Sequence, residues 1–261
     1  MGDSARQPWS DVVPLDSVPV ASPLAIGILT SQVYVPRVSS DFSIDRALAA
    51  MIDHTLLRPD ALGSEIDKLC EEARRFGFRT VCVQPIFVAR AARNLAGSVV
   101  GVTAVVAFPH GATPTVVKAF ETERARAEGA TEIDMVANLG WIRAGDDEAV
   151  TDEVSRIVTV AAGAAVKVIL ETTLFSAERN QAAARAAIAG HASFVKTSTG
   201  YGPAGATVED VELLRRVVGD AAGVKASGGI KTRAQALALV AAGASRIGAS
   251  ASIALVALSQ G

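Results

Sequence analysis

The chain has 261 residues, half of them hydrophobic, with 25 basic against 27 acidic residues and a formal net charge of −2. The length suits a single α/β barrel, and the balanced charge argues against a nucleic acid as partner. No apolar run reaches transmembrane length without a charge or glycine, so no membrane partner is expected. Cys70 and Cys82 form no CxxC pair and no disulfide framework, which is typical of a reducing compartment such as the cytoplasm.

Residues 1–43 differ from the rest of the chain in composition. They are rich in Pro, Ser, Asp and Val and have no clear helical period. A secretory signal needs a basic segment before an apolar core, whereas Asp3 and Asp11 fall in this region and several prolines interrupt it. We therefore predict an irregular N-terminal extension at 1–43, whose role the sequence does not indicate.

From Ile44 a helical piece leads into a regular alternation of strands and helices. The predicted strands are 51–55, 80–83, 99–106, 132–136, 166–170, 194–196, 224–226 and 246–248. The predicted helices are 64–76, 86–95, 115–128, 147–162, 177–189, 207–218, 232–242 and a last one after Ser250. Glycines at 77, 129, 190 and 243 follow four of these helices, as expected for C-terminal caps.

Eight strands with eight following helices predict an α/β fold, a single (β/α)8 TIM barrel over residues 44–261. A doubly wound open sheet is the structural alternative. No GxGxxG motif follows the first strand to favour it.

Charged residues on the predicted strands are the main indication of function. Barrel strands are buried on both faces and are usually apolar, so ionisable residues on them are costly unless they are paired or functional. The acids and lysines on or next to these strands are Asp53, Glu132, Asp134, Lys167, Glu171, Lys196 and Lys225. Together they predict a reaction centre.

Lys196 and Lys225 lie at the C-terminal ends of neighbouring predicted strands, which is the active-site face of such barrels. Lys167 lies at the start of its strand, so we interpret it as structural and paired with Glu132. Two neighbouring lysines disfavour the ammonium form, and a neutral lysine amine can form a Schiff base with a carbonyl. Asp134 could relay protons to and from the intermediate.

Glycine-rich turns open the last two helices. The segment after Lys225 contains Gly228 and Gly229, and the segment after the last strand contains Gly248 and Ser250. Loops after strands seven and eight of a barrel often bind phosphate through backbone N–H groups. Two ordinary helix N-caps are the alternative, but the position beside a candidate lysine favours a phosphate site.

These motifs resemble the deoxyribose-phosphate aldolase family over about residues 44–256. The matching segments are IDHTLL at 52–57, VCV at 81–83, VAFPHG at 106–111, EIDMV at 132–136, KVILET at 167–172, FVKTSTG at 194–200 and VKASGGI at 224–230. The family is a class I, metal-free aldolase without a cofactor. It joins acetaldehyde and glyceraldehyde 3-phosphate reversibly into 2-deoxy-D-ribose 5-phosphate.

The resemblance implies a role for each matched residue. Lys196 would form the Schiff base, Lys225 would lower its pKa, Asp134 would shuttle protons and Asp53 would join that network. The substrate and its phosphate would meet seven further residues: Thr197, Thr199, Gly200, Gly228, Gly229, Gly248 and Ser250. A homodimer or larger homo-oligomer acting on small sugar phosphates and aldehydes is expected.

The sequence departs from the family in two places. Some members end in a tail with a tyrosine that helps proton transfer, whereas this chain ends ALSQG. The turn at 201–205 lies in a segment that varies in the family.

Two other functions remain open from the residues alone. A transaldolase-like enzyme would share the strand-six lysine without needing Lys225. A phosphate-binding barrel without covalent catalysis would form no imine with acetaldehyde.

Overall fold

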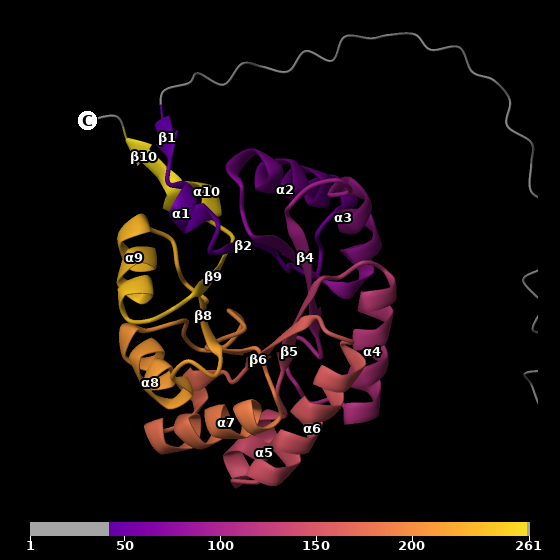
Figure 1. The fold of residues 1–261 in the computed structure, drawn as a ribbon, viewed down its shortest axis with the longest axis vertical. Helices are drawn as coiled ribbons and strands as arrows, with labels where there is room; N and C mark the ends of the chain where they lie inside the picture. Colours follow the sequence, from indigo (N-terminus) through magenta and orange to yellow (C-terminus); the bar gives the residue numbers. More distant parts are fainter. Residues whose placement is uncertain (1–41, 260–261) are drawn as a thin grey trace, which may run out of the picture. The chain divides into compact units, whose positions relative to one another are not determined.

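The computed structural model describes residues 42–259, and most of the predicted N-terminal extension therefore lies outside the described residues. Its central element is a closed barrel of eight parallel strands in sequential order, ringed by helices (Figure 1). This confirms the predicted (β/α)8 barrel. The strands are β2 (Ile52–Leu56), β3 (Thr80–Val83), β4 (Gly101–Val106), β5 (Glu132–Val136), β6 (Ala165–Ile169), β7 (Phe194–Lys196), β8 (Gly223–Ser227) and β9 (Arg246–Ala249).

A helix follows each barrel strand along the chain. These helices are α2 (Gly63–Phe76), α3 (Val88–Asn94), α4 (Thr115–Ala127), α6 (Asp147–Val160), α7 (Ala177–Ala189), α8 (Val208–Val218), α9 (Arg233–Ala241) and α10 (Ser252–Val256). Each has a predicted counterpart. Among the helices of residues 42–259, none is both long and apolar enough to cross a membrane.

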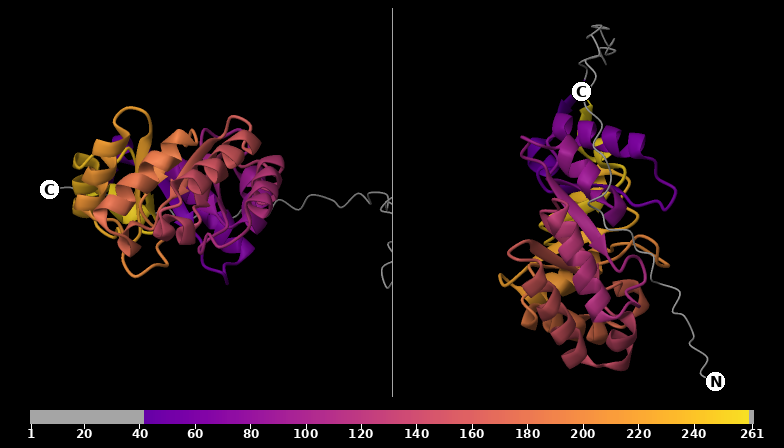
Figure 2. Two further views of the ribbon diagram at one scale, coloured as in Figure 1. Left: turned by 90° about the horizontal axis from the view of Figure 1, so that it is seen from below. Right: turned by 90° about the vertical axis from the view of Figure 1, so that its right-hand side faces the viewer.

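Five short elements were not predicted. A short helix, α5 (Leu139–Ala144), precedes α6, and two 3₁₀ turns, η2 (Pro85–Phe87) and η3 (Thr172–Leu174), follow β3 and β6. Strand β1 (Phe42–Ile44) pairs antiparallel with β10 (Ala257–Ser259) where we expected only irregular chain and the start of a helix. The two strands lie side by side next to α1 (Arg46–Ala49) and α10 (Figures 1 and 2).

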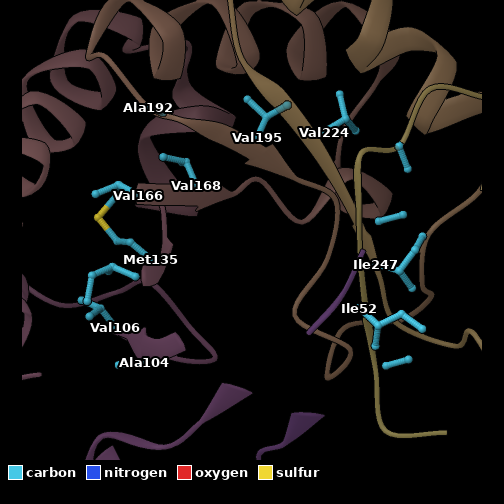
Figure 3. Close-up of a cluster of buried hydrophobic side chains, with 14 of the residues drawn as sticks. Ile52, Ala104, Val106, Met135, Val166, Val168, Ala192, Val195, Val224 and Ile247 are labelled. Carbon is cyan, nitrogen blue, oxygen red and sulfur yellow. The ribbon is translucent and has the colours of Figure 1, made fainter. Parts of the chain in front are cut away.

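The two faces of the barrel strands differ in chemistry. Successive side chains of a strand point to opposite faces, so one set meets the helices and the other fills the barrel. Figure 3 shows the apolar set, which belongs to the main core cluster. Its labelled members are Ile52, Ala104, Val106, Met135, Val166, Val168, Ala192, Val195, Val224 and Ile247.

The alternate positions carry the predicted charged residues. Asp53 follows Ile52, Asp134 precedes Met135, and Lys167 lies between Val166 and Val168. All three charged side chains are fully buried. The hydrophobic core therefore lies mainly between strands and helices, and a large part of the barrel interior is ionic.

The end of α7 corrects one cap prediction. Gly77, Gly129 and Gly243 have positive φ, as a left-handed cap requires. Gly190 instead has φ −79, and the next residue, His191, takes the left-handed conformation at φ 66. A Cβ at Gly190 would lie 2.7 Å from Val154 Cβ and 2.8 Å from the Thr151 carbonyl oxygen. Glycine is thus needed here for close packing of α7 against α6.

We expect Gly190→Ala to lower the free energy of unfolding by about 1–3 kcal/mol, because the added methyl overpacks this contact. Urea denaturation followed by circular dichroism would measure it. Adding Val154→Ala removes part of the clash. The free energy of unfolding of the double variant should therefore fall by less than the sum of the decreases in the two single variants. Strict additivity would contradict this explanation.

Candidate active site

A pocket of about 360 Å³ opens at the C-terminal ends of the barrel strands, with Lys196 in its wall. Six further residues predicted for the substrate line it: Thr199, Gly200, Gly228, Gly229, Gly248 and Ser250. A larger hollow of about 890 Å³ lies beside α3 and α4, but no lysine lines it. The smaller pocket is therefore the one that joins the predicted residues in one place.

Asp134 is in contact with three lysines at the base of this pocket. Its Oδ2 accepts hydrogen bonds from Lys196 Nζ at 2.6 Å and Lys225 Nζ at 2.7 Å, and its Oδ1 accepts one from Lys167 Nζ at 2.8 Å. Lys196 and Lys225 are register partners on neighbouring strands, as predicted. All four side chains are almost completely buried.

Asp53 extends this network to the far side of the barrel. Its Oδ2 pairs with Lys225 Nζ, and its Oδ1 accepts a hydrogen bond from Arg246 at 2.7 Å. Arg246 also pairs with Glu132 at 2.9 Å and lies over the Phe194 ring. Arg246 was not among the predicted site residues. An arginine beginning a strand already rich in glycine and serine gives little sequence signal of its own.

Lys167 belongs to the same network, which corrects our view of it as separate from the reaction centre. Its pairing with Glu132 is present at 2.7 Å, but its ammonium group also contacts Asp134. The strand begins at Ala165, one residue earlier than predicted, so Lys167 is its middle residue and does not lie at its start. A middle position brings the ammonium group level with Asp134, its register partner.

The charges of this cluster do not cancel. It contains four cationic side chains, Lys167, Lys196, Lys225 and Arg246, and three carboxylates, Asp53, Glu132 and Asp134. Deprotonating one lysine would make the buried cluster neutral. Lys196 is the only one of the four that lines the pocket.

The electrostatics select the same lysine. Burial lowers the pKa of Lys196, and Lys225 acts in the same direction, while Asp134 opposes both. Burial also disfavours the ammonium form of Lys225, but the carboxylates of Asp134 and Asp53 outweigh it and raise its pKa. The ammonium groups of Lys167, Lys196 and Lys225 hold the pKa of Asp134 well below its usual range despite its burial. Lys196 is thus the member of the pair suited to lose its proton.

One side of the pocket is lined by the loops after β7 and β8. The two loops are joined by hydrogen bonds from Ala206 N–H to the Ser227 and Gly228 carbonyls, at 3.0 and 3.2 Å. Gly228 and Gly229 both have positive φ, at 89 and 72. Lys231 also lines the pocket and was not predicted, although it directly follows the VKASGGI motif at 224–230. Its cation would complement a phosphate.

Thr197 is the one predicted binding residue that the pocket does not include. It is fully buried, and its hydroxyl hydrogen-bonds to the Ser227 backbone, donating to the carbonyl at 3.3 Å and accepting from the N–H at 3.2 Å. Its contacts therefore join β7 to β8. Thr199, two residues later, does line the pocket.

The mouth of the pocket includes Tyr201 and Arg58, which were not predicted. The Tyr201 hydroxyl donates to the Leu57 carbonyl at 2.8 Å, and its ring meets Phe108 edge to face at 5.5 Å. These contacts join loops far apart in the sequence. A single tyrosine in a variable turn carries no pattern that would have revealed them.

Fold and site together define a (β/α)8 barrel enzyme with a buried, pocket-facing lysine held by a carboxylate. Residues 47–259 match the model of the DeoC/LacD family aldolases. A deoxyribose-phosphate aldolase of Bacillus cereus (strain AH187) is 50% identical over 210 residues, covering 80% of this chain and 94% of that relative. A deoxyribose-phosphate aldolase of Bacillus cytotoxicus is 48% identical over the same length.

Solved structures agree with this match. The tetrameric deoxyribose phosphate aldolase of Aeropyrum pernix has 36% identity and a TM-score of 0.76, over 80% of this chain and 89% of that one. An aldolase called QR15 has 35% identity and a TM-score of 0.77, over 80% and 93%. The chain belongs to the DeoC/LacD aldolase family, and the predicted family and class of enzyme, a carbon–carbon lyase, are confirmed.

We expect Lys167→Met to destabilise the fold by about 3–5 kcal/mol, because it leaves the carboxylates of Glu132 and Asp134 buried without this partner. Chemical denaturation of the purified protein would measure the loss. Arg79→Met is the matched control. Arg79 approaches the same Glu132 at 3.9 Å but is more than half exposed, so its loss should change stability by less than about 1 kcal/mol. Equal effects of the two substitutions would contradict the ionic role of Lys167.

Proposed function

We propose that this chain reversibly cleaves 2-deoxy-D-ribose 5-phosphate into D-glyceraldehyde 3-phosphate and acetaldehyde through a Schiff base on Lys196. The observation that carries the proposal is a buried lysine of lowered pKa in the wall of the pocket, 2.6 Å from the Asp134 carboxylate. The relatives that are deoxyribose-phosphate aldolases support this substrate class.

The first half of the reaction forms the iminium. The neutral Lys196 amine attacks the C1 aldehyde of the open-chain sugar phosphate and gives a carbinolamine. Asp134, which contacts Lys196 Nζ directly, relays the protons, and water leaves. The protonated imine is an electron sink for the carbons next to it.

The second half breaks the carbon–carbon bond. The C3 hydroxyl loses its proton, the C2–C3 bonding electrons move into the iminium, and glyceraldehyde 3-phosphate departs. The resulting enamine takes a proton at C2, and water hydrolyses the iminium to acetaldehyde and free Lys196. The reverse sequence builds the sugar phosphate.

Lys225 and Asp53 act on this chemistry through Asp134 and Lys196. Lys225 remains protonated because two carboxylates raise its pKa, and its charge opposes the ammonium form of Lys196. Asp53 pairs with Lys225 and holds it beside Asp134. We propose that Asp53 orients Lys225 without touching the substrate.

The phosphate would bind among Gly228, Gly229, Gly248 and Ser250, with Lys231 supplying a cation. Thr199 and Gly200 would contact the sugar carbons between the phosphate and Lys196. This placement is supported by the fact that all these residues line the same pocket as Lys196.

We also propose that the enzyme needs no metal or organic cofactor, because the lysine iminium itself provides the electron sink. A homo-oligomer is proposed from the tetrameric Aeropyrum pernix relative. A cytoplasmic role in deoxyribonucleotide catabolism is proposed from the substrate and from the free thiols of Cys70 and Cys82.

Borohydride trapping tests the Schiff base. Incubation with acetaldehyde and sodium borohydride should leave a reduced two-carbon adduct on Lys196, found by peptide mass spectrometry. Lys196→Leu should lose the adduct and reduce cleavage by more than about a thousandfold, because the covalent step is removed. Labelling spread over surface lysines, or none, would argue for a barrel that binds phosphate without covalent catalysis. Product analysis would separate a transaldolase-like activity.

The pH dependence of cleavage tests the role of Lys225. Only neutral Lys196 reacts, so cleavage activity rises as the pH rises through the pKa of Lys196. This pKa lies below the ordinary lysine value. Lys225→Met removes a positive charge that repels the Lys196 ammonium group. It also leaves the Asp134 carboxylate more available to that ammonium group, so both effects raise the pKa of Lys196. The acidic limb of the kcat/KM profile should move to higher pH by about one unit or more, with about tenfold lower activity per unit on that limb.

Lys68→Met is the control for that shift. Lys68 is an exposed lysine, and its loss changes the net charge by the same amount. Its profile should match the unsubstituted enzyme. An unmoved acidic limb in a folded Lys225→Met variant would contradict the role given to Lys225.

A further inference from the structure

Glu171 is a buried carboxylate that the proposed reaction does not use. It follows β6 directly, is 2% exposed and has φ 52, in the left-handed region that few residues other than glycine adopt. Burying a carboxylate and holding this backbone conformation are both unfavourable. Such a combination is typical of a residue retained for function.

Within residues 42–259, the hydrogen bonds of its side chain all go to one residue of the pocket wall. Glu171 Oε2 accepts from the Thr199 backbone N–H at 3.1 Å and from the Thr199 hydroxyl at 2.5 Å. Glu171 Oε1 is buried and receives no hydrogen bond within residues 42–259. Glu171 itself does not line the pocket, whereas Thr199 does. Glu171 can therefore affect a substrate only through Thr199.

These contacts determine what the Thr199 hydroxyl can offer. A threonine hydroxyl has one proton to donate and two lone pairs that can accept. Its proton is donated to Glu171, and one lone pair accepts the Tyr201 N–H at 3.0 Å. The remaining lone pair can only accept a hydrogen bond. Towards a bound molecule, Thr199 is therefore an acceptor and not a donor.

We propose that Glu171 is a positioning residue that fixes the Thr199 hydroxyl as an acceptor for a hydroxyl group of the substrate. The inference rests on the proposed function, since the sugar phosphate and glyceraldehyde 3-phosphate carry hydroxyl groups. Acetaldehyde carries none. Glu171 thus contributes to recognition of the hydroxylated substrate and not to formation of the Schiff base with the small aldehyde.

Substitution of Glu171 by leucine should remove the acceptor of the Thr199 proton. Since a leucine side chain accepts no hydrogen bond, the Thr199 hydroxyl would then turn its proton towards the pocket. Loss of the acceptor should raise KM for 2-deoxyribose 5-phosphate about tenfold with kcat within about threefold, as expected for lost binding of the substrate and transition state alike. Thr199→Val should give the same effect, and Thr199→Ser, which keeps the hydroxyl, should retain a KM near the original.

The double variant Glu171→Leu/Thr199→Val distinguishes this role from a merely structural one. If Glu171 acts through the Thr199 hydroxyl, the double variant should show about the same tenfold rise in KM as either single variant. A rise of about a hundredfold, the product of independent effects, would overturn the inference. So would an unchanged KM in Glu171→Leu.

Trapping with acetaldehyde and borohydride separates the inference from the function on which it rests. Each variant should modify Lys196 at a rate within about twofold of the original protein. A matching loss of trapping and cleavage in Glu171→Leu would overturn the inference, because the defect would then reach the lysine. Absence of trapping in the original protein would instead overturn the proposed function.

Glu171→Asp is the second variant should Glu171→Leu fail to fold. It keeps the charge but shortens the side chain by one methylene, so it cannot reach Thr199 at the same distance. The same rise in KM is expected. An unchanged KM in Glu171→Asp would overturn the inference.

Discussion

The carboxylate of Asp134 is the contact on which the site depends. It receives hydrogen bonds from Lys196, Lys225 and Lys167, which come from three different strands. Without it three buried ammonium groups would repel one another at close range. With it they are held at distances that still leave Lys196 the easiest to deprotonate. One carboxylate therefore both joins three strands of the barrel and contacts the lysine proposed to form the Schiff base.

The ionic interior changes what stabilises this fold. The apolar side chains shown in Figure 3 lie between the strands and the helices, so hydrophobic burial acts mainly outside the sheet. Inside, only the small cluster of Leu57, Cys82 and Val105 forms a second apolar group. A buried ionic network adds little net stability over an apolar core but is very sensitive to the loss of one partner. Selection for chemistry best explains why the interior is charged.

Much of the fold and of the reaction centre could be predicted from the sequence. Strands β3, β5 and β7 have the predicted bounds, because each begins after a turn and carries a short β-branched or charged run. The meeting of Lys196 and Lys225 followed from their place on neighbouring parallel strands, whereas Asp134 lies in the middle of β5 and reaches them across the barrel interior. The family motifs supplied the remaining roles.

What the sequence did not predict depends on long-range contacts. Arg246 enters the network only because β9 closes the barrel beside β2, and Tyr201 reaches Leu57 across 144 positions of the chain. Thr197 and Thr199 lie two positions apart in one motif, and the local pattern does not distinguish them. The conformation of the loop determines that Thr199 lines the pocket and Thr197 does not. The pairing of β1 with β10 likewise cannot be predicted from local sequence, because each strand has only three residues.

The pairing of β1 with β10 has a practical consequence for rearranging the chain. Since Phe42 and Ser259 are register partners, a short linker could join residues 42–259 into a ring. New termini opened in an exposed loop away from the pocket would then give a circular permutant with the catalytic strands in their present order.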